Sequence, residues 1–424
     1  MLGESPDLGV VRVEPHEFVP EAVRAVAWHV TSLVGVLGTE PGVAHTSTVA
    51  SGGHLATRSA MAGRTGRRAR PGGPTPRTVD HMATEARELA VGERTVRVTN
   101  PDRVLFPEVG VTKLDLVEFY LALGDAVLRA VHHRPTTLRR FPSGVDGESF
   151  FQKRVPRGAP DWVDTVRIRF PSGRSADEIC PTEVAVLAWV ANLGAIELHP
   201  WPVRRDRVEQ PDQLRVDLDP QPGTGFADAV RAAELTRELL AELGYPGFVK
   251  TSGGRGLHVL VPIEPEWEFV TVRRAVIALA RELARREPEL LTTAWWKEER
   301  GRRVFVDYNQ AARDRTIVAA YSVRASPTAT VSTPVEWDEL GEVDPRDLTT
   351  RTVPGLVARR GDPHADLRSH PSRLETLLEL ADRDERDHGL GDLPYPPDHP
   401  KMPGEPARVQ PSRARGRGTA DREA

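Results

Sequence analysis

The sequence has a single cysteine, Cys180, and no long run of uncharged apolar residues. One cysteine excludes a disulfide framework and any zinc or iron–sulfur site built from several thiolates, and it favours a reducing, cytoplasmic location. A transmembrane helix needs about 20 consecutive apolar residues, and the apolar segment at residues 22–37 is interrupted by Arg24 and His29. Because this segment follows an acidic start, it is not typical of a signal peptide. We therefore expect no membrane association.

Lysine is scarce as well: there are five, and arginine supplies nearly all of the 57 positive side chains. The 61 acidic residues leave a formal net charge of −4, so the chain is not a bulk polycation. Any contact with nucleic acid must be confined to a local basic surface. The length of 424 residues, with 39% hydrophobic and 28% charged residues, is that of a globular protein of about two to four domains.

The chain divides into regions of different composition. Residues 1–81 are rich in Gly, Ser, Thr, Ala, Arg and Pro and lack a sustained helical or strand period, which predicts disorder. Our hypothesis is that Met82 is the biological start and that the upstream part is an over-extended translation; an intact mass that includes it would contradict this. We expect a catalytic domain at 95–345, a helical extension at 346–390 and a disordered Pro/Arg-rich tail at 391–424.

The patterned region mixes strands and helices without a strict alternation. Thr112 and Asp115 form a capping-box pattern before a run of apolar residues at helical spacing that reaches Val127. Further helices are predicted at 182–193, 227–243 and 271–286, and strands at 95–100, 195–201, 214–220, 247–252, 257–263, 302–309 and 316–324. This order favours an α+β fold with a central, mostly antiparallel sheet flanked by helices.

Asp217 and Asp219 lie two residues apart on a predicted strand, Leu-Arg-Val-Asp-Leu-Asp-Pro. Residues i and i+2 of a strand point to the same face, so both carboxylates project together while Val216 and Leu218 face a core. Two convergent carboxylates suit Mg²⁺ or Mn²⁺. The alternative is a solvated strand end.

A glycine-rich turn follows in the sequence Ser252-Gly253-Gly254-Arg255-Gly256, with His258 just beyond it. Glycines let backbone amides approach phosphate oxygens, and Arg255 and His258 supply cationic or hydrogen-bonding partners. The turn is not a P-loop, because no Gly-Lys-Ser/Thr follows and the flanks are strands. The alternative is a hairpin turn whose glycines only provide positive φ.

A third carboxylate, Asp307, ends the apolar strand Arg-Arg-Val-Phe-Val, with Arg300 before it and Gln310 and Arg324 after it. A single aspartate at a strand end is usually a cap. Together with Asp217 and Asp219, it would complete a two-metal site for phosphoryl transfer, in which the ions activate the attacking oxygen and stabilise the leaving pyrophosphate.

These three motifs, in this order and spacing, resemble those of the archaeo-eukaryotic primase superfamily. The flanking sequence is closest to one branch of this superfamily: the segments at 99–120, 134–154, 187–201 and 316–325 resemble the polymerase domain of bacterial ligase D. The resemblance covers about residues 95–345. It implies a primase-polymerase fold with an N-terminal α/β lobe, and template-dependent addition of nucleotides, preferably ribonucleotides, with Mn²⁺ or Mg²⁺.

The resemblance also assigns residues by position. Asp217, Asp219 and Asp307 match the metal-binding carboxylates. The incoming NTP or dNTP would be contacted by Ser252, Arg255, His258, His199, Arg300, Gln310, Arg324 and Arg139. Arg255 stands where the family often has lysine, which keeps the charge but not the geometry of an ammonium group. For His199 the alternative, without the family, is a packed residue at a strand end.

Two further sets would contact DNA. Asn100, Arg103 and Lys113 match the family's site for the 5′-phosphate of a downstream strand, and Lys113 lies in a first helical turn whose free amides and dipole favour an anion. Phe150 and Phe151 match the aromatic residues that stack on template bases, within residues 131–175, where nine Arg/Lys outnumber four Asp/Glu. The alternative for the phenylalanines is core packing of one or both.

None of the five lysines stands in a Lys-x-Asp-Gly motif, and no His/Asp-rich phosphoesterase region is visible, so we expect a stand-alone polymerase module that is neither ligase nor nuclease. The leading hypothesis is a primase-polymerase that extends or fills gapped or broken DNA ends in non-homologous end joining. On the resemblance alone, its partners would be Ku and a separate ATP-dependent DNA ligase, at the nucleoid. The alternatives are a non-catalytic module that binds and bridges DNA ends, and a replicative or plasmid primase of the same superfamily.

Overall fold

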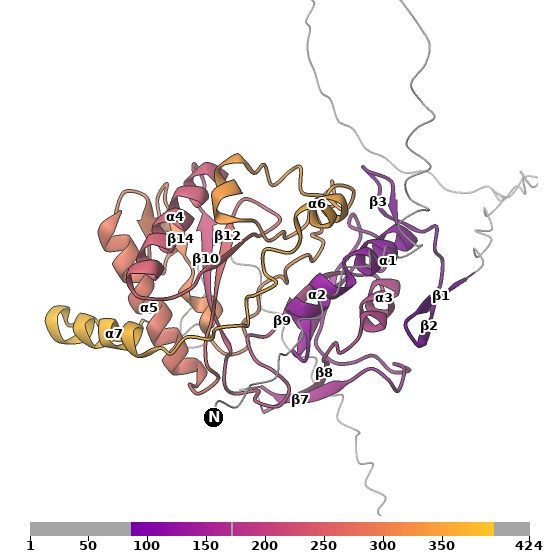
Figure 1. Ribbon diagram of the computed structural model, residues 1–424, viewed down its shortest axis with the longest axis horizontal. Helices are drawn as coiled ribbons and strands as arrows, with labels where there is room; N and C mark the ends of the chain where they lie inside the picture. Colours follow the sequence, from indigo (N-terminus) through magenta and orange to yellow (C-terminus); the bar gives the residue numbers. More distant parts are fainter. Residues whose placement is uncertain (1–85, 171–172, 394–424) are drawn as a thin grey trace, which may run out of the picture. The chain divides into compact units, whose positions relative to one another are not determined.

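The computed structural model describes residues 86–170 and 173–393, all of which belong to one compact unit, Val79–Ala424. The predictions for residues 1–81, for Met82 and for the tail from residue 394 onward lie outside the described residues. The described part combines α-helices with two five-stranded and two two-stranded sheets, in which nearly all strand pairs are antiparallel (Figure 1). The predicted α+β class is confirmed.

The N-terminal lobe, residues 86–200, places three helices against a sheet. The sheet has the order β6-β5-β8-β7, and β9 also pairs with β5. The strands are β1 (Arg87–Val91), β2 (Arg94–Val98), β3 (Val104–Phe106), β4 (Val111–Thr112), β5 (Thr136–Arg140), β6 (Phe150–Gln152), β7 (Thr165–Arg169), β8 (Ser175–Ile179) and β9 (Ala195–Pro200); the helices are α1 (Lys113–Ala122), α2 (Gly124–Val131) and α3 (Val184–Asn192). Leu116, Tyr120 and Val186 are fully buried in the core between the helices and the sheet.

The C-terminal lobe, residues 213–310, is built on the sheet β11-β12-β10-β14-β13. Its elements are β10 (Gln213–Pro220), α4 (Phe226–Glu242), β11 (Phe248–Thr251), β12 (Leu257–Pro262), α5 (Phe269–Arg286), β13 (Leu291–Thr292), β14 (Val304–Val306) and the 3₁₀ turn η3 (Tyr308–Ala311). Strand β10 alternates strictly: Leu214, Val216 and Leu218 lie in the core that α4 and α5 cover. The intervening residues, which include both aspartates, therefore face the opposite side of the sheet.

After β14 the chain returns to the N-terminal lobe, where Ala319, Tyr321 and Val331 join its core. It then forms α6 (Val353–Arg360) and comes back to the C-terminal lobe, where α7 (Glu375–His388) packs against α5. The prediction of a strand at 316–324 is wrong. Tyr321 has φ +61°, a left-handed conformation that interrupts an extended chain, and the Ala319 amide instead donates to the Leu198 carbonyl at 2.8 Å.

The helix that begins at Lys113 has the predicted capping box. The hydroxyl of Thr112 accepts from the Asp115 amide at 3.2 Å, and the Asp115 carboxylate accepts from the Thr112 amide at 2.8 Å. The apolar pattern suggested one helix to Val127, but α1 and α2 are separate because Leu123, with φ −105° and ψ 15°, leaves helical geometry. Gly124, a poor helix former, follows the break.

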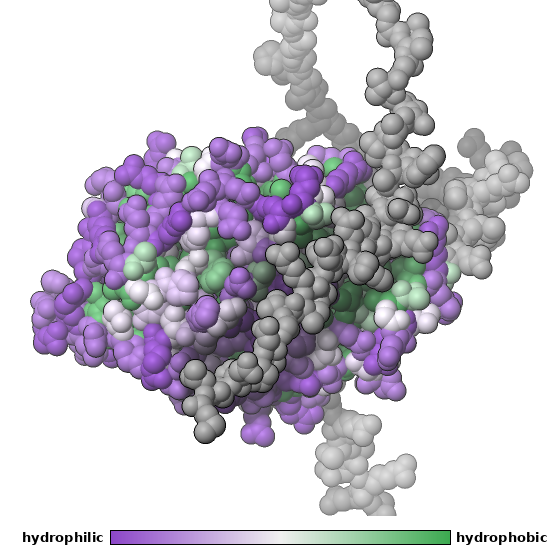
Figure 2. Space-filling model, in the orientation of Figure 1, coloured by the Kyte–Doolittle hydropathy of each residue, from purple (hydrophilic) through white to green (hydrophobic). Residues whose placement is uncertain are grey.

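Hydrophilic side chains cover most of the described surface on the face shown in Figure 2, and apolar residues lie between them in small separate areas. Among the described residues, no helix is both long enough and apolar enough to cross a membrane.

Candidate active site

The two strands that carry the predicted carboxylates are neighbours in the sheet. Strand β10 pairs with β14 so that Leu218 lies opposite Val306 and Asp219 opposite Phe305, and the Asp307 amide donates to the Asp217 carbonyl at 2.8 Å. The structure thus brings Asp217, Asp219 and Asp307 together on one face of the sheet, in a group that we call the acidic edge, although they are up to 90 residues apart in the chain.

The glycine-rich turn between β11 and β12 lies against this edge. A Cβ atom at Gly256 would lie 2.6 Å from the Leu218 carbonyl oxygen, and one at Gly253, where φ is +72°, would lie 2.4 Å from Arg324 Cγ. Both positions require glycine for close packing. The Ser252 hydroxyl accepts from the amides of Gly254 and Gly256, which fixes the turn beside Asp217.

The turn, the acidic edge and the segment after η3 enclose an open pocket of about 340 Å³. Its walls include most of the predicted catalytic and nucleotide-binding residues: Asp217, Asp219, Ser252, Arg255, His258, His199, Gln310 and Arg324. The pocket therefore has an acidic wall on β10 and a wall of cationic and hydrogen-bonding groups opposite it. This is the arrangement that a metal–triphosphate substrate needs.

Burial raises the pKa of Asp217 well above its usual value, and the nearby charges of Asp307 and Asp219 raise it further. The positive charges of Lys250 and Arg324 lower the pKa of Asp217, but burial and the neighbouring carboxylates outweigh them. Burial also raises the pKa of Asp307. Closely spaced carboxylates that repel one another are hard oxygen donors in need of a cation, so these residues fit Mg²⁺ or Mn²⁺.

The three carboxylates are not gathered into a ready-made centre. Within the described residues, no group of three His, Cys, Asp or Glu side chains has the arrangement of a metal site. Instead Asp219 accepts a hydrogen bond from Gln221 at 3.1 Å, and Asp307 accepts one from Gln310 at 3.0 Å. Asp219 and Asp307 are thus each held by a neighbouring glutamine through Oδ2.

Three of the predicted residues, Asp307, Arg300 and Arg139, do not line the pocket, although Asp307 lies beside Asp217. Arg300 is buried behind the acidic edge, where it donates to the carbonyls of Ala294 and Trp295, and its guanidinium carbon lies 3.5 Å from the centre of the Phe305 ring. It acts on the site through its charge, which favours the ionised form of Asp307. Arg139 contacts Glu197 and lies at the pocket's edge beside Phe151.

Lys250 is a buried residue of this site that the sequence reasoning missed. Three neighbouring strands align Lys250, His258 and Asp217 in register. Lys250 Nζ lies 2.8 Å from His258 Nδ1, and His258 Nε2 lies 3.4 Å from Asp217 Oδ1. Because the lysine nitrogen donates, Nδ1 of a neutral His258 accepts this hydrogen bond. The ring proton is then on Nε2, and the Nε2–H group points to Asp217. Two features of the sequence could have identified Lys250: lysine is rare in this chain, and the register of the predicted hairpin places Lys250 opposite His258.

Glu197 is the second missed residue, and it links β9 to β5 and to the segment that follows η3. Its carboxylate lies 3.0 Å from His199 Nε2, 3.3 Å from Arg139 Nη1 and 3.6 Å from Arg324 Nε, and it accepts from the Ala325 amide at 3.1 Å. Burial by itself raises the pKa of Glu197, but the His199 hydrogen bond and the Arg324 charge outweigh it and lower the pKa to about 2. Glu197 is therefore ionised at neutral pH and orients three predicted nucleotide-binding residues.

The predicted 5′-phosphate residues lie together around the start of α1. The Lys113 amide donates to the Arg103 carbonyl at 2.8 Å, and the Arg103 amide donates to the Asn100 carbonyl at 3.1 Å. Burial lowers the pKa of Lys113, and the charges of Arg103 and Arg140 lower it further. Arg140, which the sequence reasoning did not single out, belongs to this cationic cluster.

One reason given for this site is wrong. The first amides of α1 are not free for an anion, because those of Lys113, Leu114 and Asp115 donate to Arg103 O, Pro101 O and Thr112 Oγ. The prediction of an anion site therefore depends on the side chains alone: Lys113 Nζ makes one hydrogen bond, to the Thr99 carbonyl at 2.6 Å, and an ammonium group has three donors.

Phe150 and Phe151 are not core residues: their side chains are 46% and 59% exposed on β6. Successive residues of a strand point to opposite faces, and the two rings lie beside different cations. Phe151 lies 5.5 Å from both Arg139 and the His199 ring, on the pocket side, whereas Phe150 lies 5.4 Å from Arg140, on the side of the Lys113 cluster.

Comparison with known proteins decides the family. The family model of the LigD primase-polymerase domain matches residues 112–364, more than half of the chain. The chain belongs to this family. The resemblance to the polymerase domain of ligase D is thereby confirmed.

Individual relatives and a solved structure support the same family assignment. The multifunctional non-homologous end joining protein LigD of Pseudomonas aeruginosa is 35% identical over 309 residues, which cover 73% of this chain and 34% of the relative. That of Mycobacterium tuberculosis is 33% identical over 292 residues, covering 64% and 37%. The polymerase domain of Mycobacterium tuberculosis ligase D, solved in complex with DNA, superposes with a TM-score of 0.60 at 32% identity, over 65% of this chain and 99% of that domain. This member of the LigD primase-polymerase family thus spans about a third of the length of these curated relatives.

Proposed function

We propose that this chain is a metal-dependent nucleotidyltransferase that adds nucleotides, preferably ribonucleotides, to gapped or broken DNA ends in template-dependent fashion during non-homologous end joining. The observation that carries the proposal is the shared pocket, in which carboxylates that repel one another lie beside Arg255, His258 and Arg324. The metal ion of a metal–nucleotide substrate would supply positive charge to the carboxylates, and its triphosphate would supply negative charge to the arginines.

Each wall has a distinct role. Asp217, Asp219 and Asp307 would hold Mn²⁺ or Mg²⁺, which activates the attacking hydroxyl and stabilises the leaving pyrophosphate. Opposite them, Arg255 and Arg324 neutralise the triphosphate in a partly buried site where charge-assisted hydrogen bonds are strong.

The DNA would lie along the N-terminal lobe. The cluster of Lys113, Arg103 and Arg140 takes the 5′-phosphate of the downstream strand, and the exposed rings of Phe150 and Phe151 stack on template bases. Ku and a separate ATP-dependent DNA ligase are the partners that the family suggests.

The test is primer extension on a gapped duplex with a downstream 5′-phosphate, in Mn²⁺, with NTPs and dNTPs compared. We expect extension by the wild type and by the surface control Asp338→Asn, and none by Asp217→Asn with DNA binding retained. If the wild type binds DNA without extending the primer, the chain is an end-bridging module. De novo synthesis that is indifferent to the 5′-phosphate would indicate a primase.

A further inference from the structure

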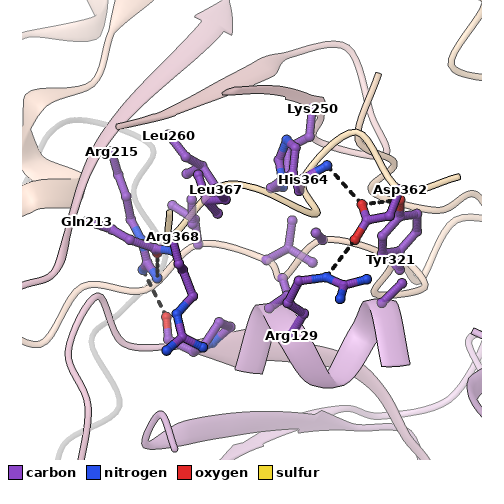
Figure 3. Close-up of a pocket in the computed structure, with 17 residues that line it drawn as sticks. Arg129, Gln213, Arg215, Lys250, Leu260, Tyr321, Asp362, His364, Leu367 and Arg368 are labelled. Carbon is purple, nitrogen blue, oxygen red and sulfur yellow. Dashed lines mark hydrogen bonds and ion pairs between the residues drawn. The ribbon is translucent and has the colours of Figure 1, made fainter. Parts of the chain in front are cut away.

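A second cavity lies on the same face of β10 as the active-site pocket. Gln213 and Arg215 line the second cavity, whereas Asp217 and Asp219, further along the strand, line the first. Figure 3 shows its other walls: Arg129 from α2, the segment 317–321, and residues of the segment 362–368.

The charges around this cavity do not balance: among the described residues of its wall, Arg129, Arg215, Lys250 and Arg368 are basic, and Asp362 is the one carboxylate. Asp212, just before β10, binds Arg134 at 2.5 and 2.9 Å and Arg204 at 3.0 Å, so one carboxylate already serves two guanidinium groups. Arg215 is 2% exposed and hydrogen-bonds only neutral oxygens, the Pro200 carbonyl and the Gln213 amide oxygen. A buried cation without an anionic partner is costly.

Arg215 also has spare donors. Its hydrogen bonds to the described residues use one N–H each on Nε, Nη1 and Nη2; a guanidinium carries five N–H groups, so two remain. Burial lowers the pKa of Arg215 to about 9, and the neighbouring charge of Arg134 contributes to the decrease. Both facts indicate a cation that lacks a counter-ion.

Two further arginines reach the cavity from other elements. Arg129 donates through Nε to Asp362 at 2.9 Å, and its terminal nitrogens make no hydrogen bond to the described residues. Arg368 lies at the mouth with its side chain only partly buried; that burial lowers its pKa, the charge of Arg134 lowers it further, and the charge of Asp212 raises it. Three guanidinium groups thus line one small space from three directions (Figure 3).

We propose that this cavity binds one small inorganic oxyanion of the phosphate type. The cavity volume is about 30 Å³, roughly two to three times that of one water-sized sphere, which admits a single ion and excludes a nucleotide. Guanidinium groups bind oxyanions through paired N–H donors, so an ion with several oxygens satisfies donors from three directions, whereas chloride offers one centre.

The bound ion would act on the active site. Ile317 and Val318 line both cavities, and the Ala319 amide donates to the carbonyl of Leu198, the residue before His199. An ion that fastens the segments 317–321 and 362–368 to Arg215 would therefore stabilise the wall of the nucleotide pocket. This inference does not depend on the proposed polymerase activity.

The test follows thermal unfolding of the full chain as inorganic phosphate replaces chloride at constant ionic strength. A ligand that binds only the folded state raises the unfolding midpoint with its concentration. Arg368→Gln, at the exposed mouth, should weaken the apparent phosphate affinity about ten-fold, equivalent to about 1.4 kcal/mol. Arg359→Gln, an exposed arginine on α6 outside the cavity, is the matched control and should behave as wild type.

The active-site pocket also contains arginines and must be separated from the cavity. Arg324→Gln, which affects only that pocket, should leave most of the phosphate effect in place. Crystals soaked in arsenate should show an anomalous peak beside Arg215. The proposal is overturned if Arg368→Gln loses no more affinity than Arg359→Gln, if Arg324→Gln removes the whole effect, if chloride stabilises as well as phosphate, or if the cavity contains only water.

Discussion

The buried carboxylate of Glu197 offers a sharp test of how the active-site pocket is organised. Glu197→Gln keeps the shape of the side chain but removes the charge that faces His199, Arg139 and Arg324. The glutamine can still accept one hydrogen bond, but its amide nitrogen is a donor that opposes the N–H groups on the other side. We expect lower stability and a nucleotide pocket whose cations are poorly oriented.

The magnitude follows from the pKa of Glu197, which is lowered from 4.5 to about 2. A decrease of that size corresponds to about 3 kcal/mol of stabilisation of the ionised form in the folded state. Because the folded pKa is the lower one, this stabilisation is fully present above about pH 4.5 and is lost as the pH falls through about 2. At neutral pH, Glu197→Gln should therefore lose about 3 kcal/mol of unfolding free energy, a substantial part of the 5–15 kcal/mol typical of a domain.

Urea denaturation at pH 7 measures the stability, and primer extension below the unfolding range measures KM for the nucleotide. Glu183→Gln is the matched control, since Glu183 pairs with Arg94 at 3.1 Å with both side chains about a third exposed, and such pairs contribute about 0–1 kcal/mol. We expect KM for the nucleotide to rise in Glu197→Gln while DNA affinity stays near that of the control. If both variants lose equal stability and retain the wild-type KM, Glu197 does not orient the pocket.

Three further predictions concern metal and DNA. Asp217→Ala or Asp307→Ala should abolish nucleotide addition while DNA binding stays nearly intact; extension by either at saturating Mn²⁺ would contradict the metal role. DNA binding by the wild type should weaken steeply with salt, with a slope of roughly −0.7 to −0.9 per neutralised phosphate, and alanines at Phe150 and Phe151 should weaken template binding with little change in that slope; a flat salt dependence would argue against nucleic acid. Lys113→Ala should weaken gapped DNA with a 5′-phosphate about ten-fold or more and barely affect a 5′-hydroxyl end, whereas equal losses would refute the phosphate pocket.

Local patterns predicted those parts of the fold whose cause is local. The capping box of Thr112 and Asp115, the alternation along β10 and the hairpin around Ser252 formed as expected, because neighbouring residues determine each of them. The strand predicted at 316–324 did not form, because distant residues determine this segment. Its β-branched and aromatic residues favour a strand, but its amides donate to the carbonyl of Leu198 and to the irregular chain around Ser332. Tertiary hydrogen bonds overrode strand propensity there.

The predicted site residues show the same division. Asp217 and Asp219 could be placed on one face from spacing alone, and their position at the pocket agrees with it. The expectation of free amides at the start of α1 failed because the preceding loop folds back, so that Pro101 and Arg103 supply acceptors that no helical pattern reveals. Glu197 was missed since its partners Arg139 and Arg324 lie 58 and 127 residues away in the sequence.

Strand β10 shows where such inference from sequence ends. Alternation places Arg215 on the same face as Asp217, so a cation beside the acidic edge was foreseeable. What the strand cannot show is whether that cation meets a carboxylate, because its surroundings are supplied by Arg129 on α2 and by the segment that ends at Arg368, 86 residues before it and 153 after it. Only the assembled lobes show that Asp212 is already occupied by Arg134 and Arg204, and that the carboxylate in the cavity wall, Asp362, pairs with Arg129 and not with Arg215. A catalytic carboxylate can thus be inferred from its strand, whereas an uncompensated charge is a property of the whole fold.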